Sequence, residues 1–498
     1  MMTQRQVTIG IDVGTTGTKL VALDVEQGLI GQVTMASDLI SLQPGYAEAD
    51  PMVWSDNIMS GLRQLITQTG LASTEVAGIA ATGMVPAVLL LDDGGRPLRA
   101  AILQNDARAI SEIDEVRDAL ASYDPLNITG SAVTQQSVGP TALWLARNEP
   151  EVWARTRHIV GSYDYALMSL GARPHVEDNW AIESGLFTLT GDRFEQSFEV
   201  AGIDHRIVPE VVRPGTVVGG LSREAAEETG LRPGTPLVVG GADHVLSAFA
   251  AGVQNPGDCL VKLGGAGDIL AASAAPVVDA RVYLDAHPVP GLWLPNGCMA
   301  TSGSLIRWIQ GLLGGIALPE LDDQADQRDP AQVLCLPYFL GEKSPLHDPQ
   351  LRGVFAGLHL GVTGADLYRA VLEGIAFGFK HHVEVFDSMG MKITRALVTN
   401  GGSRSRFWKQ IHADVLNVPL FPVIDHPGAS LAAAEIAAIG IGLLPDWDSI
   451  QRFLELGDPV MPRQDNVDLY AQAYDDWRAL GETTTPISHN ISERTQSL

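Results

Sequence analysis

A glycine-rich run at residues 10–20, GIDVGTTGTKL, has the composition of a phosphate-binding turn. Glycines let backbone N–H groups approach phosphate oxygens, while Thr15, Thr16 and Lys19 add hydroxyl donors and a cation. The spacing differs from the GxxxxGK[ST] pattern of P-loops. Asp12, at the end of the preceding apolar stretch, could hold Mg²⁺ through water. A tight hairpin with threonines at turn positions is the alternative interpretation.

A second candidate is the run 240–252, GGADHVLSAFAAG, in which Asp243 follows a strand-like segment and two glycines. An Asp at the start of a helix could project into a cleft and accept a proton from a substrate hydroxyl. The alternative is that Asp243 only caps the helix, which is a common role for Asp at that position. His244, a single histidine beside it, favours a structural role.

A third candidate lies at residues 399–420, where Gly401 and Gly402 precede an amphipathic segment. Glycines at the start of a helix allow flat approach by an adenine or a ribose. Taken alone, this pair equally fits a packed connection.

Strands and turns surround these candidates. Apolar stretches at 6–12, 19–25 and 29–37, with turns GTTG and EQG between them, predict a meander of three strands. Residues 258–273 repeat the layout of strand, glycine-rich turn (LGGAGD) and strand, which suggests an internal duplication.

Helix-like and strand-like segments alternate through both halves of the chain, which predicts α/β layers. The expected helices are 50–68, 141–155, 302–313, 363–388 and 403–417, and the strand-like runs between the two hairpins include 76–81 and 87–92. Leu237–Gly241 marks the expected end of the first half. Residues 481–498 are polar, rich in Ser and Thr and without periodicity, so we expect a frayed tail.

Composition excludes several functions. The chain has 498 residues, with 33 Lys+Arg against 59 Asp+Glu, a net charge of −26. This acidic balance argues against nucleic-acid binding. Three dispersed cysteines form neither a disulfide framework nor a zinc signature. With no signal-peptide pattern and no apolar run long enough to span a membrane, we expect a cytoplasmic protein.

Several longer motifs together resemble the FGGY family of carbohydrate kinases, within the actin-like ATPase superfamily. The likeness runs from Ile9 to about Asp475. Besides the run 10–20, the motifs are GYAEADPMVW at 45–54, GPTALWLARNEPEVW at 139–153, LPYFLGEKSPLHDPQLRGVFAGL at 336–358 and ADLYRAVLEGIAF at 365–377. Thr141 stands where the family usually has a lysine.

The resemblance implies a role for each candidate. Asp243 matches the catalytic base and Asp12 the metal-associated acid. The positions that match nucleotide contacts are Gly14, Thr15, Thr16, Lys19, Gly264, Gly265, Gly303, Arg307, Gly401, Gly402 and Arg406. At Gly265 related kinases usually carry a Thr or Ser, so backbone N–H groups would replace that hydroxyl contact.

The implied sugar site departs further from the family pattern. AILQNDAR at 101–108 resembles the AILWNDxR segment of xylulose kinases and retains Asp106 and Arg108. Met84, Val85 and Pro86 occupy the place of a run that usually contains Gln and His, and those polar groups would hydrogen-bond sugar hydroxyls. A solvated ion pair is the alternative interpretation of Asp106 and Arg108.

We therefore expect two actin-like (ribonuclease H-like) α/β domains, 1–241 and 242–498, with a cleft between them. The expected reaction is ATP- and Mg²⁺-dependent phosphorylation of a ketose, D-xylulose first, by a kinase that resembles xylulose kinases. Family members are often dimers, so a homodimer is expected as well. Ribulose, erythritol and ribitol are alternative substrates, and a non-catalytic nucleotide-binding regulator is the alternative function.

Overall fold

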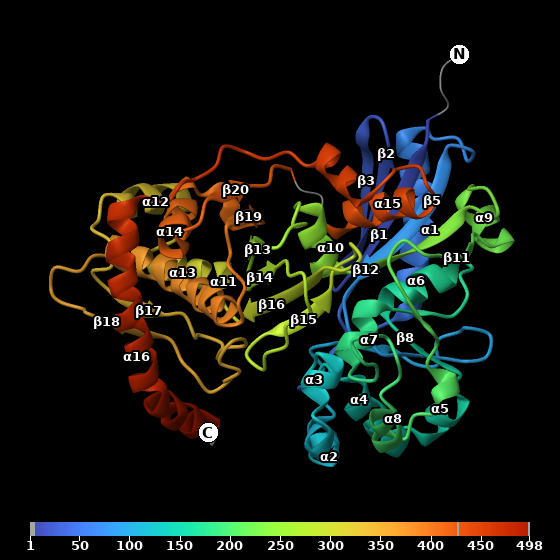
Figure 1. The fold of residues 1–498 in the computed structure, drawn as a ribbon, viewed down its shortest axis with the longest axis horizontal. Coiled ribbons are helices and arrows are strands. Elements are labelled where there is room, and N and C mark those ends of the chain that lie inside the picture. The colour runs from blue at the N-terminus through green and yellow to red at the C-terminus, as the bar shows by residue number, and fades with distance from the viewer. Residues whose placement is uncertain (1–4, 426–427, 497–498) are drawn as a thin grey trace. The chain divides into compact units, whose positions relative to one another are not determined.

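The computed structural model describes residues 5–425 and 428–496, which form two compact units (Figure 1). The first unit comprises Met1–Gly252, Leu284–Trp293 and Pro427–Leu454, and the second comprises Val253–Tyr283, Leu294–His426 and Glu455–Leu498. These units differ from the expected domains 1–241 and 242–498, since late segments of the chain return to the first unit. Functional domain boundaries stay a prediction.

The first unit contains a six-stranded mixed sheet in the order β11–β12–β5–β1–β2–β3. Its strands are β1 (Val7–Gly14), β2 (Gly17–Asp24), β3 (Gly28–Ala36), β5 (Val76–Gly83), β11 (Val217–Gly220) and β12 (Pro236–Ala242). β1, β2 and β3 pair in antiparallel fashion, which confirms the predicted meander, whereas β5 runs parallel to both β1 and β12. The carboxyl ends of β1, β5 and β12 therefore meet at one edge.

Helix α15 (Ala429–Gly440) packs directly on β1 and β5 (Figure 1). The approach is so close that a Cβ at Gly10 would lie 1.9 Å from the backbone oxygen of Ser430. The hydroxyl of Thr8 donates to the carbonyl of Ala434 at 2.6 Å. The many alanines of α15 permit this contact, and a larger residue at position 10 would separate the helix from the sheet.

The helices of the first unit cover this sheet and an additional lobe. Helix α1 (Pro51–Thr69) shows why they form: Asp50 caps it, Trp54, Ile58 and Leu62 recur on its buried face, and Gly70 ends it in the left-handed region. The other elements of the unit are β4 (Glu48–Ala49), β6 (Leu89–Leu91), β7 (Ala101–Ile102), α2 (Ile110–Leu120), η1 (Ala121–Tyr123), α3 (Pro125–Thr129), α4 (Val138–Asn148), α5 (Pro150–Arg155), β8 (His158–Val160), α6 (Ser162–Leu170), β9 (Val176–Glu177), α7 (Asp178–Ser184), α8 (Glu195–Ala201), η2 (His205–Ile207), β10 (Val211–Val212), α9 (Arg223–Thr229), α10 (Asp243–Ala250) and η4 (Trp447–Phe453).

The second unit repeats the central arrangement of the first. β13 (Asp258–Leu263) pairs antiparallel with β14 (Gly267–Ala271) and parallel with β19 (Arg395–Thr399), as β1 pairs with β2 and β5. This confirms the second predicted hairpin and is the arrangement that an internal duplication would produce. The order within the unit is β16–β14–β13–β19–β20, with β16 at Trp293–Met299 and β20 at Leu420–Pro422.

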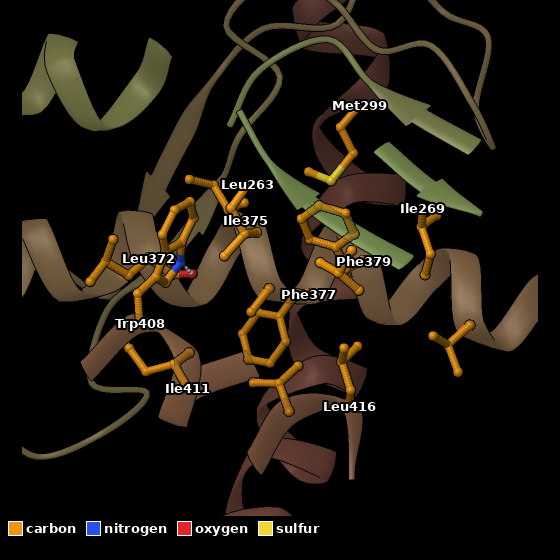
Figure 2. Packing of buried hydrophobic residues seen from close by; sticks show 14 of the residues in the cluster. Leu263, Ile269, Met299, Leu372, Ile375, Phe377, Phe379, Trp408, Ile411 and Leu416 are labelled. Carbon is orange, nitrogen blue, oxygen red and sulfur yellow. Dashed lines mark hydrogen bonds between the residues drawn. The ribbon is translucent and has the colours of Figure 1, made fainter. Parts of the chain in front are cut away.

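A large apolar core fixes the helices of the second unit against this sheet. Figure 2 shows Leu372 of α13 (Gly364–Ser388) beside Trp408 of α14 (Arg406–Leu416), with Phe377 and Phe379 further along α13; the indole N–H of Trp408 donates to the carbonyl of Leu372. All four residues are almost completely buried. The remaining elements here are β15 (Tyr283–Ala286, which spans the boundary between the units), α11 (Gly303–Leu312), α12 (Leu318–Asp326), β17 (Leu334–Leu336), β18 (Val354–Ala356), η3 (Gly401–Arg404) and α16 (Gln464–Gln496).

The expectation of a frayed tail at 481–498 is wrong for its described residues. α16 continues to Gln496, although Pro486 lies inside it. Ser488 and Ser492 are buried, and His489 Nε2 lies 2.7 Å from Asp348 Oδ2. Small polar residues make these contacts, so the segment lacks the apolar periodicity from which a packed helix is predicted. Residues 497 and 498 lie outside the described residues.

No helix among residues 5–425 and 428–496 combines the length and the apolar character that crossing a membrane requires.

A buried acid and a buried histidine lie side by side in the first unit. Asp164 Oδ1 is 3.7 Å from His175 Nε2, and both side chains are fully inaccessible to solvent. Burial raises the pKa of Asp164 to about 8, although the backbone N–H of Gly161 donates to its carboxyl group at 3.0 Å. Burial lowers the pKa of His175 to about 4. Near pH 6 both groups are therefore uncharged.

Asp164 predicts a loss of stability of the first unit as the pH rises from about 4 to 8, whereas His175, whose pKa is lowered to about 4, opposes that loss below about pH 6.5. An unfolded Asp ionises near pH 4, whereas folded Asp164 keeps its proton until about pH 8, so the folded state binds more protons in between. We expect Asp164→Asn, which retains an acceptor but cannot ionise, to flatten the decline in unfolding free energy by up to ~1.4 kcal/mol per pH unit. Urea unfolding at pH 5, 6, 7 and 8 measures the slope, with exposed Asp192→Asn as control. A slope unchanged by Asp164→Asn would contradict the assignment.

Candidate active site

The carboxyl edge of the first sheet gathers several of the predicted residues. In register, Val13 of β1 pairs with Gly83 of β5, and Gly83 pairs with Ala242 of β12. The hydroxyl of Thr82 donates to the carbonyl of Gly241 at 2.7 Å, and this hydrogen bond connects the carboxyl ends of β5 and β12. Asp243 is the residue after Ala242, and Asp12 is the residue before Val13, so both acids adjoin this row of paired residues.

The first glycine-rich turn forms the tip of the β1–β2 hairpin. Gly14 pairs with Gly17, leaving Thr15 and Thr16 exposed at the turn. Asp12 and Lys19 are cross-strand partners, and partial burial lowers the pKa of the Lys19 ammonium despite the opposing attraction of Asp12. The turn thus presents backbone, hydroxyl and ammonium donors together. The tight hairpin of the alternative interpretation is present as well, and the two interpretations are compatible.

Asp243 is the first residue of α10, and the residue that caps this helix is Ala242. The alternative interpretation of Asp243 as a helix cap is therefore wrong. Val245, Leu246 and Phe249 anchor the helix in the core, whereas the Asp243 side chain is 40% exposed. A carboxylate at a helix N-terminus is stabilised by the helix dipole and, here, remains accessible to a substrate.

His244 is not an isolated structural histidine, because acids from three elements surround it. Its Nε2 lies 2.7 Å from Asp285 Oδ2 of β15 and 4.0 Å from Glu183 Oε1 of α7, and its Nδ1 lies 3.5 Å from Asp243 Oδ1. Burial works against the imidazolium, but the attraction of Asp285 and hydrogen bonding raise the pKa of His244 well above its ordinary value.

Sequence reasoning missed Glu183 and Asp285, because neither stands in a motif and each is more than 40 positions from His244. A buried carboxylate supports both of them. Glu177 accepts from the backbone N–H groups that begin α7 and from the side chain of Asn179. Asn179 in turn exchanges two hydrogen bonds with the backbone of Ala286, one residue after Asp285. Glu177 thereby positions α7 and β15 with respect to α10.

The predicted nucleotide residues of the second unit lie on three neighbouring loops. The carbonyl of Gly264 accepts from the N–H of Gly303, and the carbonyl of Gly265 accepts from the N–H groups of Ser302 and Ser304. β13 and β19 run in parallel up to the pair Lys262 and Thr399, so the following loops are also adjacent. These loops carry Gly264, Gly265, Gly303, Gly401 and Gly402, with exposed Arg307 on α11 and exposed Arg406 at the start of α14.

Two of these glycines are required by close packing. A Cβ at Gly303 would lie 2.6 Å from the carbonyl oxygen of Gly264. A Cβ at Gly402 would lie 2.2 Å from the ring of Trp408 and 2.6 Å from the Cβ of Leu263. The loops therefore keep their shape only with glycine at both positions.

The residues predicted to contact sugar are of two kinds. Met84, Val85 and Pro86 follow β5 and are buried, and the carbonyl of Met84 accepts from the hydroxyl of Ser162 at 2.7 Å. They supply apolar surface next to the edge that carries Asp243. Asp106 and Arg108 belong instead to a buried network of charges.

The interpretation of Asp106 and Arg108 as a solvated ion pair is wrong, since each side chain is only 2% exposed. The Asp106 carboxylate accepts from the N–H of Ala47 and from the backbone N–H, Nε and Nη2 of Arg108, at 2.6 to 2.9 Å. Arg108 also pairs with Glu48 at 2.7 Å, and its guanidinium lies 4.0 Å from the ring centre of Tyr46. Four hydrogen bonds occupy this carboxylate, so its predicted contact with sugar stays a prediction.

Comparison with known proteins identifies the family. The N-terminal domain of the FGGY family of carbohydrate kinases matches residues 7–250, and the C-terminal domain of that family matches residues 263–441. The chain belongs to this family, as its motifs predicted, and is therefore a sugar phosphotransferase that uses ATP.

Several similar proteins match nearly the full length of the chain. The crystal structure of xylulose kinase from Rhodospirillum rubrum is 40% identical, with a TM-score of 0.92 over 97% of this chain and 100% of its own. A xylulose kinase from Staphylococcus epidermidis is 30% identical over 98% of this chain and 99% of its own. An autoinducer-2 kinase from Salmonella choleraesuis is 25% identical over 95% and 93%. The predicted actin-like (ribonuclease H-like) α/β fold is confirmed.

The second-unit loops give a testable prediction for nucleotide binding. Gly303→Ala forces the loop at 264–266 to move, so we expect a several-fold weaker Kd for a non-hydrolysable ATP analogue in calorimetry. Gly311→Ala lies in the same helix, its added Cβ meets nothing within 4 Å, and it should leave the Kd unchanged. Equal affinities for the two variants would remove this loop from the nucleotide site.

The buried network predicts a large cost for a conservative change. Arg108→Lys loses the guanidinium fork and its contact with Tyr46, leaving Asp106 and Glu48 buried with fewer partners. We expect a loss of roughly 2–4 kcal/mol in unfolding free energy, measured in urea. Arg147→Lys is the matched control, because Arg147 pairs with Glu115 at the surface and should change stability by less than ~1 kcal/mol. Similar losses in both variants would contradict the distinction.

Proposed function

We propose that this chain transfers the γ-phosphate of ATP to a hydroxyl of a ketose, with D-xylulose as the first candidate substrate. The observation that carries the proposal is the position of Asp243, whose accessible carboxylate follows the carboxyl end of β12 at the edge shared with β1 and β5. The similarity to two proteins described as xylulose kinases supports the choice of sugar.

Asp243 would act as the general base. The substrate O–H proton passes to its carboxylate while the hydroxyl oxygen bonds to the γ-phosphorus, and the bond from that phosphorus to the β–γ bridging oxygen breaks to release ADP. The transition state of such a transfer is loose, so positioning and charge neutralisation supply most of the acceleration. A positioned base adds roughly 10²- to 10⁴-fold.

The residues fit ATP and Mg²⁺. Lys19 and the turn around Gly14 offer donors to phosphate, and the loops at Gly264, Gly303 and Gly401 offer backbone that no Cβ obstructs. Asp12 supplies the carboxylate that Mg²⁺ takes together with water. When bound, the metal ion neutralises phosphate charge; Asp12 would hold it and Lys19 would orient the phosphates.

A second candidate substrate class is another ketose or a polyol, such as ribulose, erythritol or ribitol. The apolar run Met84–Pro86 favours it, because these side chains cannot donate hydrogen bonds to sugar hydroxyls. The 25% identity to an autoinducer-2 kinase is a further reason to test substrates other than D-xylulose.

The test is ADP production with Mg-ATP across D-xylulose, D-ribulose, L-ketoses, glycerol, erythritol and ribitol. We expect the highest kcat/KM with D-xylulose and a loss of at least ~100-fold in kcat for Asp243→Asn, with calorimetric ATP binding retained. Glu224→Gln removes an exposed acid from the first turn of another helix, α9, and should behave as wild type.

Each part of the proposal can fail separately. Higher kcat/KM with a polyol would replace D-xylulose as the substrate. Near-normal turnover by Asp243→Asn would remove Asp243 from the role of base. No turnover across the panel, with ATP still bound, would favour a nucleotide-binding regulator.

A further inference from the structure

The cluster around His244 contains more ionisable groups than proton abstraction by one aspartate requires. Asp243 and His244 begin α10, Glu183 lies in α7 and Asp285 in β15. In the described part of the chain, these three acids are the ionisable groups that face the imidazole ring. Asp285 is 2% exposed, whereas the exposed fraction of the Asp243 side chain rises to 40%. The ring thus connects a buried carboxylate to an accessible one.

We propose that His244 is a positioning residue for phosphoryl transfer: as an imidazolium held by Asp285, it fixes the Asp243 carboxylate in the orientation that receives the substrate proton. The inference rests on the proposed role of Asp243 as base. Asp243 is the exposed end of the arrangement, and solvent exposure alone would leave its carboxylate free to rotate. The Nδ1 position, 3.5 Å from Asp243 Oδ1, gives it a fixed cationic neighbour.

The distances favour a protonated histidine over a metal ligand. Glu183, His244 and Asp285 place potential ligand atoms within 4.8 Å of one another. However, His244 Nε2 and Asp285 Oδ2 are 2.7 Å apart, a length typical of a charge-assisted hydrogen bond. Two ligands about 2.1 Å from a tetrahedral ion lie more than ~3 Å apart. The proton between these atoms leaves no room for a cation.

The partly buried Glu183 and the buried Asp285 have different roles. Burial, and then the proximity of Asp285, raise the pKa of Glu183 well above its ordinary value, which favours the neutral acid at this position. Asp285 then supplies the negative charge that balances the imidazolium. Substitution by the isosteric amide separates these roles. Asp285→Asn removes the carboxylate that faces the imidazolium, whereas Glu183→Gln replaces a neutral acid by a neutral amide.

The experiment measures kcat and KM between pH 6 and 8.5 with D-xylulose, or with the best substrate of the panel. Wild-type activity should persist to pH 8, because Asp285 keeps His244 protonated. In Asp285→Asn, a histidine of ordinary pKa near 6.5 would be only about 3% protonated at pH 8. We expect kcat to fall roughly 10- to 30-fold at pH 8 relative to wild type and to recover largely at pH 6, with the KM for ATP unchanged.

The matched control is Glu183→Gln, which should follow the wild-type pH profile. His244→Asn, which keeps a neutral donor near the Nδ1 position, should have a reduced kcat that does not change between pH 6 and 8.5. Histidine ¹³Cε1 NMR, with the His244 signal assigned from this variant, reports the protonation of the ring independently of turnover. The signal should titrate well above the ordinary histidine range in the wild type and at a clearly lower pH in Asp285→Asn.

The outcomes separate this inference from the proposed function. If Asp243→Asn is inactive but Asp285→Asn shows the wild-type pH profile, or if His244 titrates near 6.5 in the wild type, the positioning role is overturned while Asp243 remains the base. If Asp243→Asn retains turnover, Asp243 is not the base and both proposals fail. A uniform loss of kcat in Asp285→Asn at every pH would indicate a structural effect and would also overturn the positioning role.

Discussion

The parallel pairing of β1, β5 and β12 is the constraint on which the candidate site of the first unit depends. It brings Asp12, Met84 and Asp243, which are far apart in the sequence, to one edge of the sheet. The contact between α15 and Gly10 holds β1 in place from its face. A strand register shifted by one residue would turn every side chain to the other face, so the chemistry at this edge depends on packing along the whole strand.

The first unit contains several acidic groups whose pKa values are raised by burial. Burial strongly disfavours the charged forms of Glu177, Asp164 and Glu183, and raises the pKa of each. Glu177 offsets this cost through the hydrogen bonds that begin α7 and align Asn179 with β15. Glu183 is one of the acids that face His244, so part of this cost arises within the candidate site itself.

Much of this fold could be predicted from the sequence. Glycine-rich turns between apolar runs identified both hairpins, and the short motifs placed Asp12, Asp243 and the loop glycines correctly on strand ends and helix starts. These signals are local, because turns and caps constrain backbone over only a few residues. The prediction of a frayed tail was wrong because Ser488 and Ser492 pack through small polar side chains, so this part of the helix has no apolar periodicity from which it could be predicted.

What could not be predicted depends on contacts between distant segments. The sequence indicates a sugar ligand or a surface ion pair at Asp106, yet its carboxylate accepts three hydrogen bonds from Arg108 and one from the backbone N–H of Ala47, which is 59 positions away. The sequence indicated only a structural role for His244, because its partners Glu183 and Asp285 lie 61 positions before it and 41 positions after it in the chain. In both cases the residue type indicates what chemistry is possible, and only the partners determine which protonation state and which orientation it has. The imidazole of His244 lies between the buried carboxyl group of Asp285 and the accessible carboxyl group of Asp243, so the histidine can position Asp243 without burying it.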